Sequence, residues 1–109
     1  MTLTEYQNKA ARTMNKQLTA REELEHALFE MSSECGEILG IFQKSLQGHE
    51  ISADDLMLEI GDLMWGVAEL CTHCGYDMDA VAEANIAKLE KRYPNGFEAE
   101  RSINRGAEG

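Results

Sequence analysis

Two long stretches of this chain carry apolar residues at helical spacing, and this pattern limits the possible folds more than any other feature. In each stretch the apolar residues recur at alternating steps of four and three, which places them on one side of an α-helix. The first series is Leu24, Leu28, Met31, Cys35, Ile38 and Phe42, and the second is Leu56, Ile60, Leu63, Val67, Leu70 and Cys74. Two such helices are expected to pack antiparallel along these stripes.

Capping residues predict where the first half of the chain becomes helical. Thr4 is expected to cap a first helix over about residues 5 to 15. Thr19 followed by Glu22 forms a capping box, which predicts a second helix that runs to about Leu46.

The second half of the chain contains signals for two more helices. Ser52 is expected to start a third helix that ends near Gly75, and Asp77 to start a fourth that ends near Arg92. With 6% aromatic residues, one proline and six methionines, the composition suits helices better than a β-sheet. The predicted fold is therefore all-α, an antiparallel bundle of about four helices.

The length of 109 residues predicts one domain, with a core at about residues 20 to 97 and a polar tail over 98 to 109. Such a chain gives each helix only one or two neighbours, so we expect an obligate homo-oligomer, a dimer or a tetramer. Trp65 and Leu58 lie opposite the stripe of the third helix, which makes that helix apolar on two faces and also indicates a second subunit.

The charge distribution excludes two classes of partner. The formal net charge is -10, and nine acidic residues but no Lys or Arg lie between Lys44 and Lys88. Such a surface repels nucleic acid and anionic membranes. The chain lacks both a run of about 18 apolar residues, which a membrane span needs, and the apolar segment of a signal peptide. Its three cysteines fit free thiols. A cytoplasmic location is therefore expected.

Two acidic pairs flank the two apolar stripes. Glu34 and Glu37 lie to one side of the first stripe, and Glu59 and Asp62 to the same side of the second. A single pair of this kind is usually a solvated helix flank, but two equivalent pairs on facing helices repel each other unless a cation offsets the charge. Carboxylate oxygens suit Mg²⁺, or Mn²⁺ in its place. A ferritin-like redox site needs Glu-x-x-His pairs, and none is present.

The order and separation of these pairs resemble a known family. "ECGE", then 21 residues, then "EIGD", with "NIAKLEKRYPNGF" downstream, is similar to the MazG-like all-α nucleoside triphosphate pyrophosphohydrolases. The resemblance implies hydrolysis of nucleoside triphosphates between the α and β phosphates. It also implies that Lys88 and Arg92 contact the phosphates with Asn85 nearby, although cations at a helix C-terminus also complement its dipole.

Two alternatives remain open from the sequence. Trp65 either anchors a core or an interface, or stacks on the nucleobase of a substrate. The chain as a whole is either this enzyme or a non-catalytic acidic helical dimer that binds a protein partner. The second alternative predicts no change of stability with metal ions.

Overall fold

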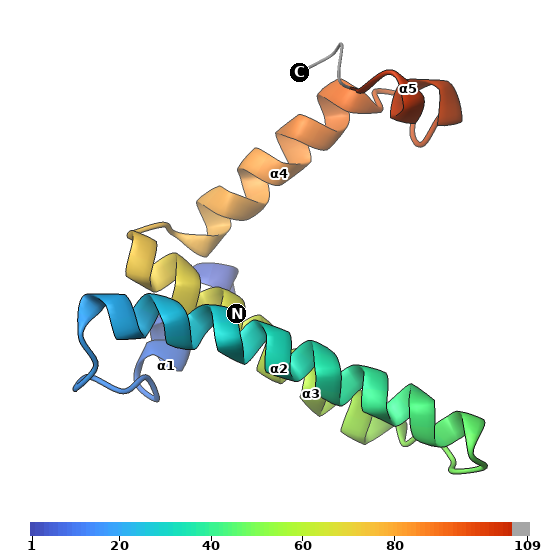
Figure 1. Ribbon diagram of the computed structural model, residues 1–109. Helices are drawn as coiled ribbons and strands as arrows, with labels where there is room; N and C mark the ends of the chain where they lie inside the picture. Colours follow the sequence, from blue (N-terminus) through green and yellow to red (C-terminus); the bar gives the residue numbers. More distant parts are fainter. Residues whose placement is uncertain (106–109) are drawn as a thin grey trace.

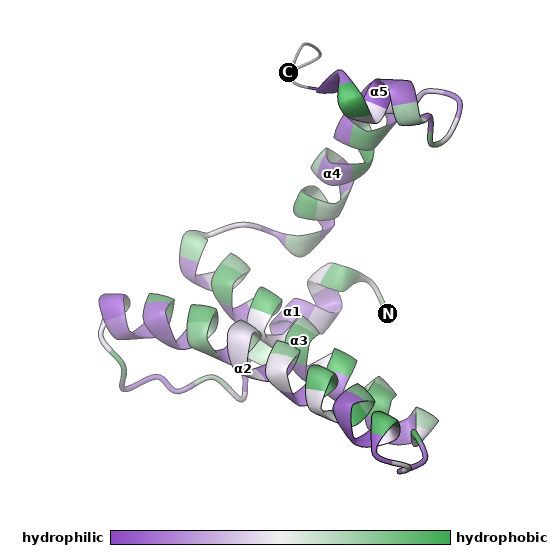
Figure 2. Ribbon diagram, turned by 45° about the vertical axis from the view of Figure 1, so that its right-hand side comes forward, coloured by the Kyte–Doolittle hydropathy of each residue, from purple (hydrophilic) through white to green (hydrophobic). Residues whose placement is uncertain are grey.

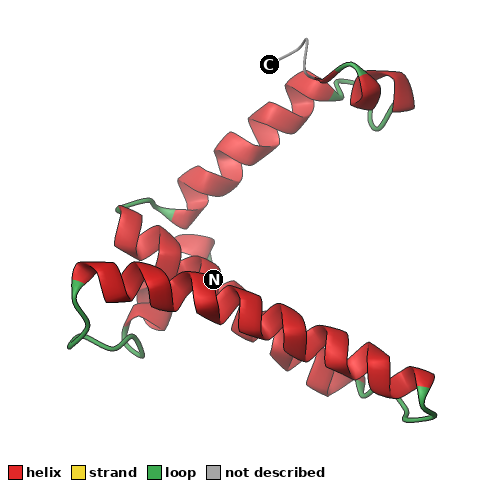
Figure 3. Ribbon diagram, viewed as in Figure 1, coloured by secondary structure: helices red, strands yellow, loops and turns green. Residues whose placement is uncertain are grey.

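The computed structural model describes residues 1–105, and five helices account for most of them (Figures 1 and 3). The long helices α2 (Ala20–Leu46) and α3 (Ala53–Cys74) lie side by side in opposite directions and form a hairpin. Helix α1 (Leu3–Ala11) packs against α3. Helix α4 (Met78–Arg92) leads away from the hairpin as an arm, and the short α5 (Ala99–Ile103) lies at its far end. Helices α2, α3 and α4 thus agree with the predicted ranges.

The ends of these helices follow from local chemistry. The Thr19 side chain accepts a hydrogen bond from the backbone N–H of Glu22, whose carboxylate accepts one from the Thr19 N–H, so the predicted capping box is confirmed. Ser52 caps α3 by one such bond, because its hydroxyl oxygen accepts from the backbone N–H of Asp55. Gly75 closes α3 with φ of 75°, a left-handed conformation that costs glycine little.

The prediction for the first helix was wrong at both ends. The cap is Thr2, which forms a capping box with Glu5, and the helix ends at Ala11. Thr4 lies inside the first turn, where its hydroxyl donates to the carboxylate of Asp77 and, at 2.7 Å, to that of Asp79. Thr4 followed by Gln7 also has the spacing of a capping box, but the Gln7 side chain bonds to Tyr76 and Met78 instead, and the box at Thr2 starts the helix.

The two hairpin helices meet along only part of each predicted stripe. The partly buried stripe residues include Leu24, Met31 and Ile38 on α2 and Leu56, Leu63 and Val67 on α3. They approach closely at Gly66, where an added Cβ would lie 2.8 Å from Cγ of Met31, a residue of the first stripe. On α2, Ala27 is buried and Glu34 partly buried while the stripe residues Leu28 and Cys35 are exposed, so the covered face is rotated from the stripe toward Glu34. Apolar residues of both predicted stripes remain half-exposed, namely Leu28, Phe42 and Ile60.

The small core lies between α1, α3 and the start of α4. Ala10, Ala68, Cys71 and Met78 form it, and Trp65 packs against this cluster. The second apolar face of α3 is thus covered in part by α1 rather than by a second subunit, which corrects one reason for expecting an oligomer. Leu58, on the same helix, is 65% exposed.

Helix α1 also holds the turn from which the α4 arm starts. The buried Gln7 amide donates to the carbonyl of Tyr76 at 2.8 Å and to the hydroxyl of Thr72 at 3.2 Å. Its oxygen accepts from the backbone N–H of Met78 at 2.8 Å. Beyond this turn α4 has few contacts, and the radius of gyration is 17.3 Å, against about 13 Å for a compact domain of this length. The single chain is therefore not a closed bundle.

Part of the predicted polar tail is folded. Just before helix α5, the rings of Tyr93 and Phe97 pack against each other with their centroids 5.5 Å apart. Within α5, the Arg101 guanidinium donates a hydrogen bond to the carbonyl of Arg92 at 3.4 Å. The tail thus turns back on the end of α4, while its residues 106–109 lie outside the described residues. Within residues 1–105, the helices lack the combination of length and apolar character needed to cross a membrane.

Candidate metal centre

Three of the four predicted carboxylates meet in the hairpin. Glu34 on α2 and Glu59 and Asp62 on α3 each place a carboxylate oxygen within 4.8 Å of the other two. We call these three residues the carboxylate cluster. They meet because Gly66, one turn after Asp62, allows the two helix backbones to approach closely. Among the described residues, Glu37 lies outside this cluster and is exposed.

The cluster is electrostatically unfavourable without a cation. A hydrogen bond with Glu59 lowers the pKa of Glu34, but burial, a hydrogen bond with Glu30 and repulsion from Asp62 together leave that pKa raised. The pKa of Glu59 is raised too, first by its hydrogen bond with Glu34, then by burial and the charges of Glu34, Asp62 and Asp55. Glu34 and Glu59 therefore share a site in which it is unfavourable for both carboxyl groups to be ionised at once.

A buried oxygen atom indicates what the cluster lacks. Oε2 of Glu34 is buried, and within residues 1–105 no fixed hydrogen-bond donor contacts it, because the neighbouring Glu59 and Glu30 are carboxyl groups that donate only when protonated. Such a buried acceptor costs free energy unless a donor or a cation satisfies it. Three hard oxygen ligands at this separation suit a Mg²⁺ or Mn²⁺ ion, which keeps several waters and uses few protein ligands. The residues present therefore fit a divalent cation.

A cavity adjoins the cluster on the side of the hairpin loop. Its volume is about 250 Å³. The residues that line it are Glu37, Gly40, Ile41, Lys44, Asp55, Leu58 and Glu59. Glu59 thus belongs to the cluster and to the cavity, and Glu37 faces the same space. The structure therefore brings all four predicted carboxylates to one side of the hairpin, three in the cluster and the fourth beside it.

The sequence analysis missed three residues near the cluster. Glu30 acts on Glu34 by a hydrogen bond and by its charge, and Asp55 acts on Glu59 by its charge. Each lies four residues before its partner, so helical spacing alone was a signal that could have identified both. Burial, and next the charge of Asp62, raise the pKa of Tyr6 on α1, a proximity for which the sequence offered no signal.

The comparison with known proteins shows the family of the chain. Residues 20–97 match the family described as the MazG nucleotide pyrophosphohydrolase domain. The chain belongs to this family. It is also similar to the "Gene 37 protein" of Mycobacterium phage L5, with 31% identity over 80 residues that cover 69% of this chain and 70% of that protein. No solved structure matches the chain.

The predicted phosphate-binding residues of this MazG domain are not at the cluster. Asn85 and Lys88 are exposed on α4, and Arg92 at its end is half-buried. Because α4 packs on α1 and then leads away from the hairpin, one protomer alone does not bring these side chains to the carboxylates (Figures 1 and 2).

Trp65 has polar and aromatic partners of its own. Its indole N–H donates to the hydroxyl of Thr13 at 2.8 Å, and its ring lies edge-on to His26 with centroids 6.1 Å apart. Nδ1 of His26 in turn contacts Oε1 of Glu69 at 2.7 Å, and Glu69 is 1% exposed. The sequence analysis assigned His26 no role, yet within residues 1–105 it is the hydrogen-bonding partner of the most buried carboxylate. The indole is thus held in place one turn beyond Asp62.

Proposed function

We propose that this chain is a metal-dependent nucleotide pyrophosphohydrolase. It cleaves nucleoside or deoxynucleoside triphosphates between the α and β phosphates, which yields a monophosphate and pyrophosphate and serves housecleaning or control of the nucleotide pool. The observation that carries this proposal is the carboxylate cluster with its buried Glu34 oxygen, in a chain of the MazG family.

The roles of the residues follow from their chemistry. Glu34, Glu59 and Asp62, with Glu37 from the adjoining cavity, hold Mg²⁺, for which Mn²⁺ can substitute. A bound ion neutralises phosphate oxygens and makes water a better nucleophile near neutral pH. Glu34 or Glu37 orients the attacking water and accepts its proton, because both lie on the α2 side of the site.

A second copy of the chain completes the site. The protomer exposes 8067 Å², whereas a monomeric protein of its mass exposes about 6,100 Å², so roughly 2,000 Å² is left for burial. Much of the excess is apolar, such as Leu46 (88% exposed) and Met57 (64%) on the hairpin and Ile86 (53%) on the arm (Figure 2). A dimer or tetramer covers these surfaces.

The same association supplies the cations and leaves a place for the base. Lys88 and Arg92 of a second copy, with Asn85, contact the phosphates, because the arm of one protomer leads away from its own cluster. Trp65, held by Thr13 one turn beyond Asp62, forms a wall for the nucleobase.

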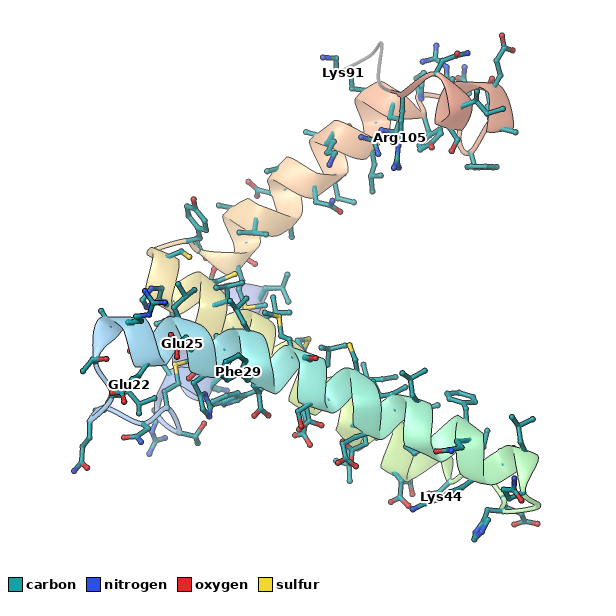
Figure 4. All side chains as sticks on the ribbon, in the orientation of Figure 1. Glu22, Glu25, Phe29, Lys44, Lys91 and Arg105 are labelled. Atoms are coloured by element: carbon teal, nitrogen blue, oxygen red, sulfur yellow. The ribbon has the colours of Figure 1, made fainter. Side chains whose placement is uncertain are left out.

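The test is to incubate the chain with a panel of ribonucleoside and deoxynucleoside triphosphates in Mg²⁺, Mn²⁺ or EDTA and to separate the products. The expected result is monophosphate plus pyrophosphate, lost in EDTA. Asp62→Asn and Glu37→Gln should abolish turnover and keep the helix content measured by circular dichroism. Glu25→Gln, which removes a half-exposed charge paired with Arg21 near the start of α2, is the matched control and should retain activity (Figure 4).

Three outcomes would contradict the proposal. Release of orthophosphate would mean a different reaction, and full activity of both carboxylate variants would mean that the site lies elsewhere. Absence of turnover with every metal would favour the acidic helical dimer that binds a protein partner.

A further inference from the structure

The cavity beside the carboxylate cluster is lined by one cationic side chain, that of Lys44, which is labelled in Figure 4. Lys44 follows Glu37 by seven residues, about two helical turns, so both lie on the same side of α2. With Asp55 and Glu59 they surround about 250 Å³, several times the roughly 30 Å³ that a water molecule occupies. The space accommodates a polar group larger than a single water.

The Lys44 ammonium is available for a ligand. Within residues 1–105 it takes part in no ion pair or hydrogen bond, although three carboxylates line the same cavity. An exposed lysine pairs only weakly with neighbouring carboxylates, since both groups stay hydrated. These carboxylates therefore do not hold Lys44 in place, and an anion that enters the cavity is free to contact it.

The rest of the chain makes the position of Lys44 distinctive. The next Lys or Arg in the sequence is Lys88, on the arm that leads away from the hairpin. Figure 4 shows Lys44 toward the loop end of the hairpin and Lys91 at the opposite end of the molecule. Among the described residues, Lys44 is thus the cation that a protomer itself supplies on the loop side of its own cluster.

We propose that Lys44 binds the pyrophosphate part of the triphosphate, so that the β and γ phosphates point toward the hairpin loop. This inference rests on the proposed function. The water oxygen bonds to the α phosphorus, and its proton passes to Glu34 or Glu37. The bond from the α phosphorus to the bridging oxygen breaks, and its electron pair stays on the departing pyrophosphate. Lys44 balances the charge that grows on that product.

This orientation also places the nucleoside. Helices α2 and α3 are antiparallel, so the direction from the cluster to Lys44 on α2 is the direction from Asp62 back to Asp55 on α3. Trp65 lies in the opposite direction along α3. The two ends of the substrate thus meet different surroundings, a lysine at the phosphate end and an indole at the base end.

The test measures binding and turnover of three variants. Lys44→Met should weaken binding of inorganic pyrophosphate in Mg²⁺, measured by calorimetry, by about 10-fold to 100-fold, as expected for loss of a charged hydrogen bond. It should lower kcat/KM by a similar factor and leave the affinity for a nucleoside monophosphate unchanged. Lys44→Arg should restore most of both losses. Lys9→Met, which removes an exposed charge from α1, is the control and should behave as the wild type.

The outcomes separate this inference from the proposed function. Wild-type affinity of Lys44→Met for pyrophosphate would overturn the role of Lys44, and so would a wild-type protein that does not bind pyrophosphate in Mg²⁺. An equal loss of monophosphate and pyrophosphate affinity would overturn the orientation. A wild-type protein that binds pyrophosphate but hydrolyses no nucleotide would refute the proposed function alone, and the calorimetry would still decide the role of Lys44.

Discussion

Gly66 is the point at which the packing of the hairpin can be tested most directly. A Cβ at this position would lie 2.8 Å from Cγ and 3.3 Å from the backbone nitrogen of Met31, and 3.4 Å from Cγ of Glu30. The Met31 side chain can move, but the α2 backbone cannot retreat without separating the two helices. A Cβ at Gly61, in the same helix, would meet nothing within 4 Å. Alanine at these two glycines therefore has opposite consequences for packing.

The magnitudes follow from two opposing effects. Alanine in place of glycine inside a helix stabilises it by about 1 kcal/mol, and both variants gain this amount. Overpacking at a close contact costs about 1–3 kcal/mol, and only Gly66→Ala pays it. Gly61→Ala should thus be stabilised, and Gly66→Ala should range from neutral to destabilised by about 2 kcal/mol. Each kcal/mol of difference in the free energy of unfolding between the two variants corresponds to about 4–8 °C in Tm for a domain of this size.

The assay is thermal unfolding followed by circular dichroism, with both variants and the wild type at one protein concentration, because association shifts Tm. The expected order is Gly61→Ala, then wild type, then Gly66→Ala. If Gly66→Ala raised Tm as much as Gly61→Ala does, α2 and α3 would not touch at Gly66. The register that brings Glu34 to Glu59 would then be incorrect.

Three further predictions test the site and the arm. Mg²⁺ or Mn²⁺ should raise Tm, since an ion at 100 times its Kd stabilises the folded state by about 2.7 kcal/mol; Glu59→Gln should lose this shift and Glu25→Gln should keep it. Gln7→Leu should lower the free energy of unfolding in urea by about 1–3 kcal/mol, because it leaves the buried N–H of Met78 without a partner; Asn8→Leu, at an exposed neighbour, should change it far less. In EDTA, the raised pKa values of Glu34 and Glu59 mean that the folded chain holds protons more tightly than the unfolded chain, for which 4.5 is the ordinary value. The stability gained from this tighter proton binding is present at a pH below 4.5 and is lost as the pH rises through the raised pKa values. Lowering the pH from about 7 to about 5 should therefore raise the Tm of the wild type relative to that of Glu59→Gln. The opposite trend would contradict the shared site.

Helix boundaries were predictable where short-range chemistry decides them. Thr19, Ser52 and Asp77 each accept a hydrogen bond from a backbone N–H two or three residues away, and Gly75 closes α3 by its own backbone conformation. For α2, α3 and α4 the deciding contacts thus span only a few residues. The first helix was misplaced because Thr2 and Thr4 both have capping-box spacing, and the side chains of Thr4 and Gln7 bond instead to residues 76–79, about 70 positions away.

The contact face of the hairpin was only partly predictable from the apolar stripes. Periodicity shows which side of a helix is apolar, but it does not show how far the covered face is rotated from that side. The rotation depends on contacts between the helices, such as that of Gly66, which lacks a side chain, with Met31. The same packing buries Glu69 against His26, a pair 43 residues apart. The direction of the arm depends likewise on Gln7, which bonds to residues about 70 positions away.

The sequence by itself determined the helical class, the ends of α2, α3 and α4, and the two acidic pairs, because these depend on residues within a few turns of one another. Only the tertiary structure decided that Glu34, Glu59 and Asp62 meet, that Glu37 lies beside them with Lys44, and that α4 leads away from the hairpin. The physical reason is that the rotation of one helix against another depends on close packing between residues distant in the chain, which a pattern within one helix does not contain.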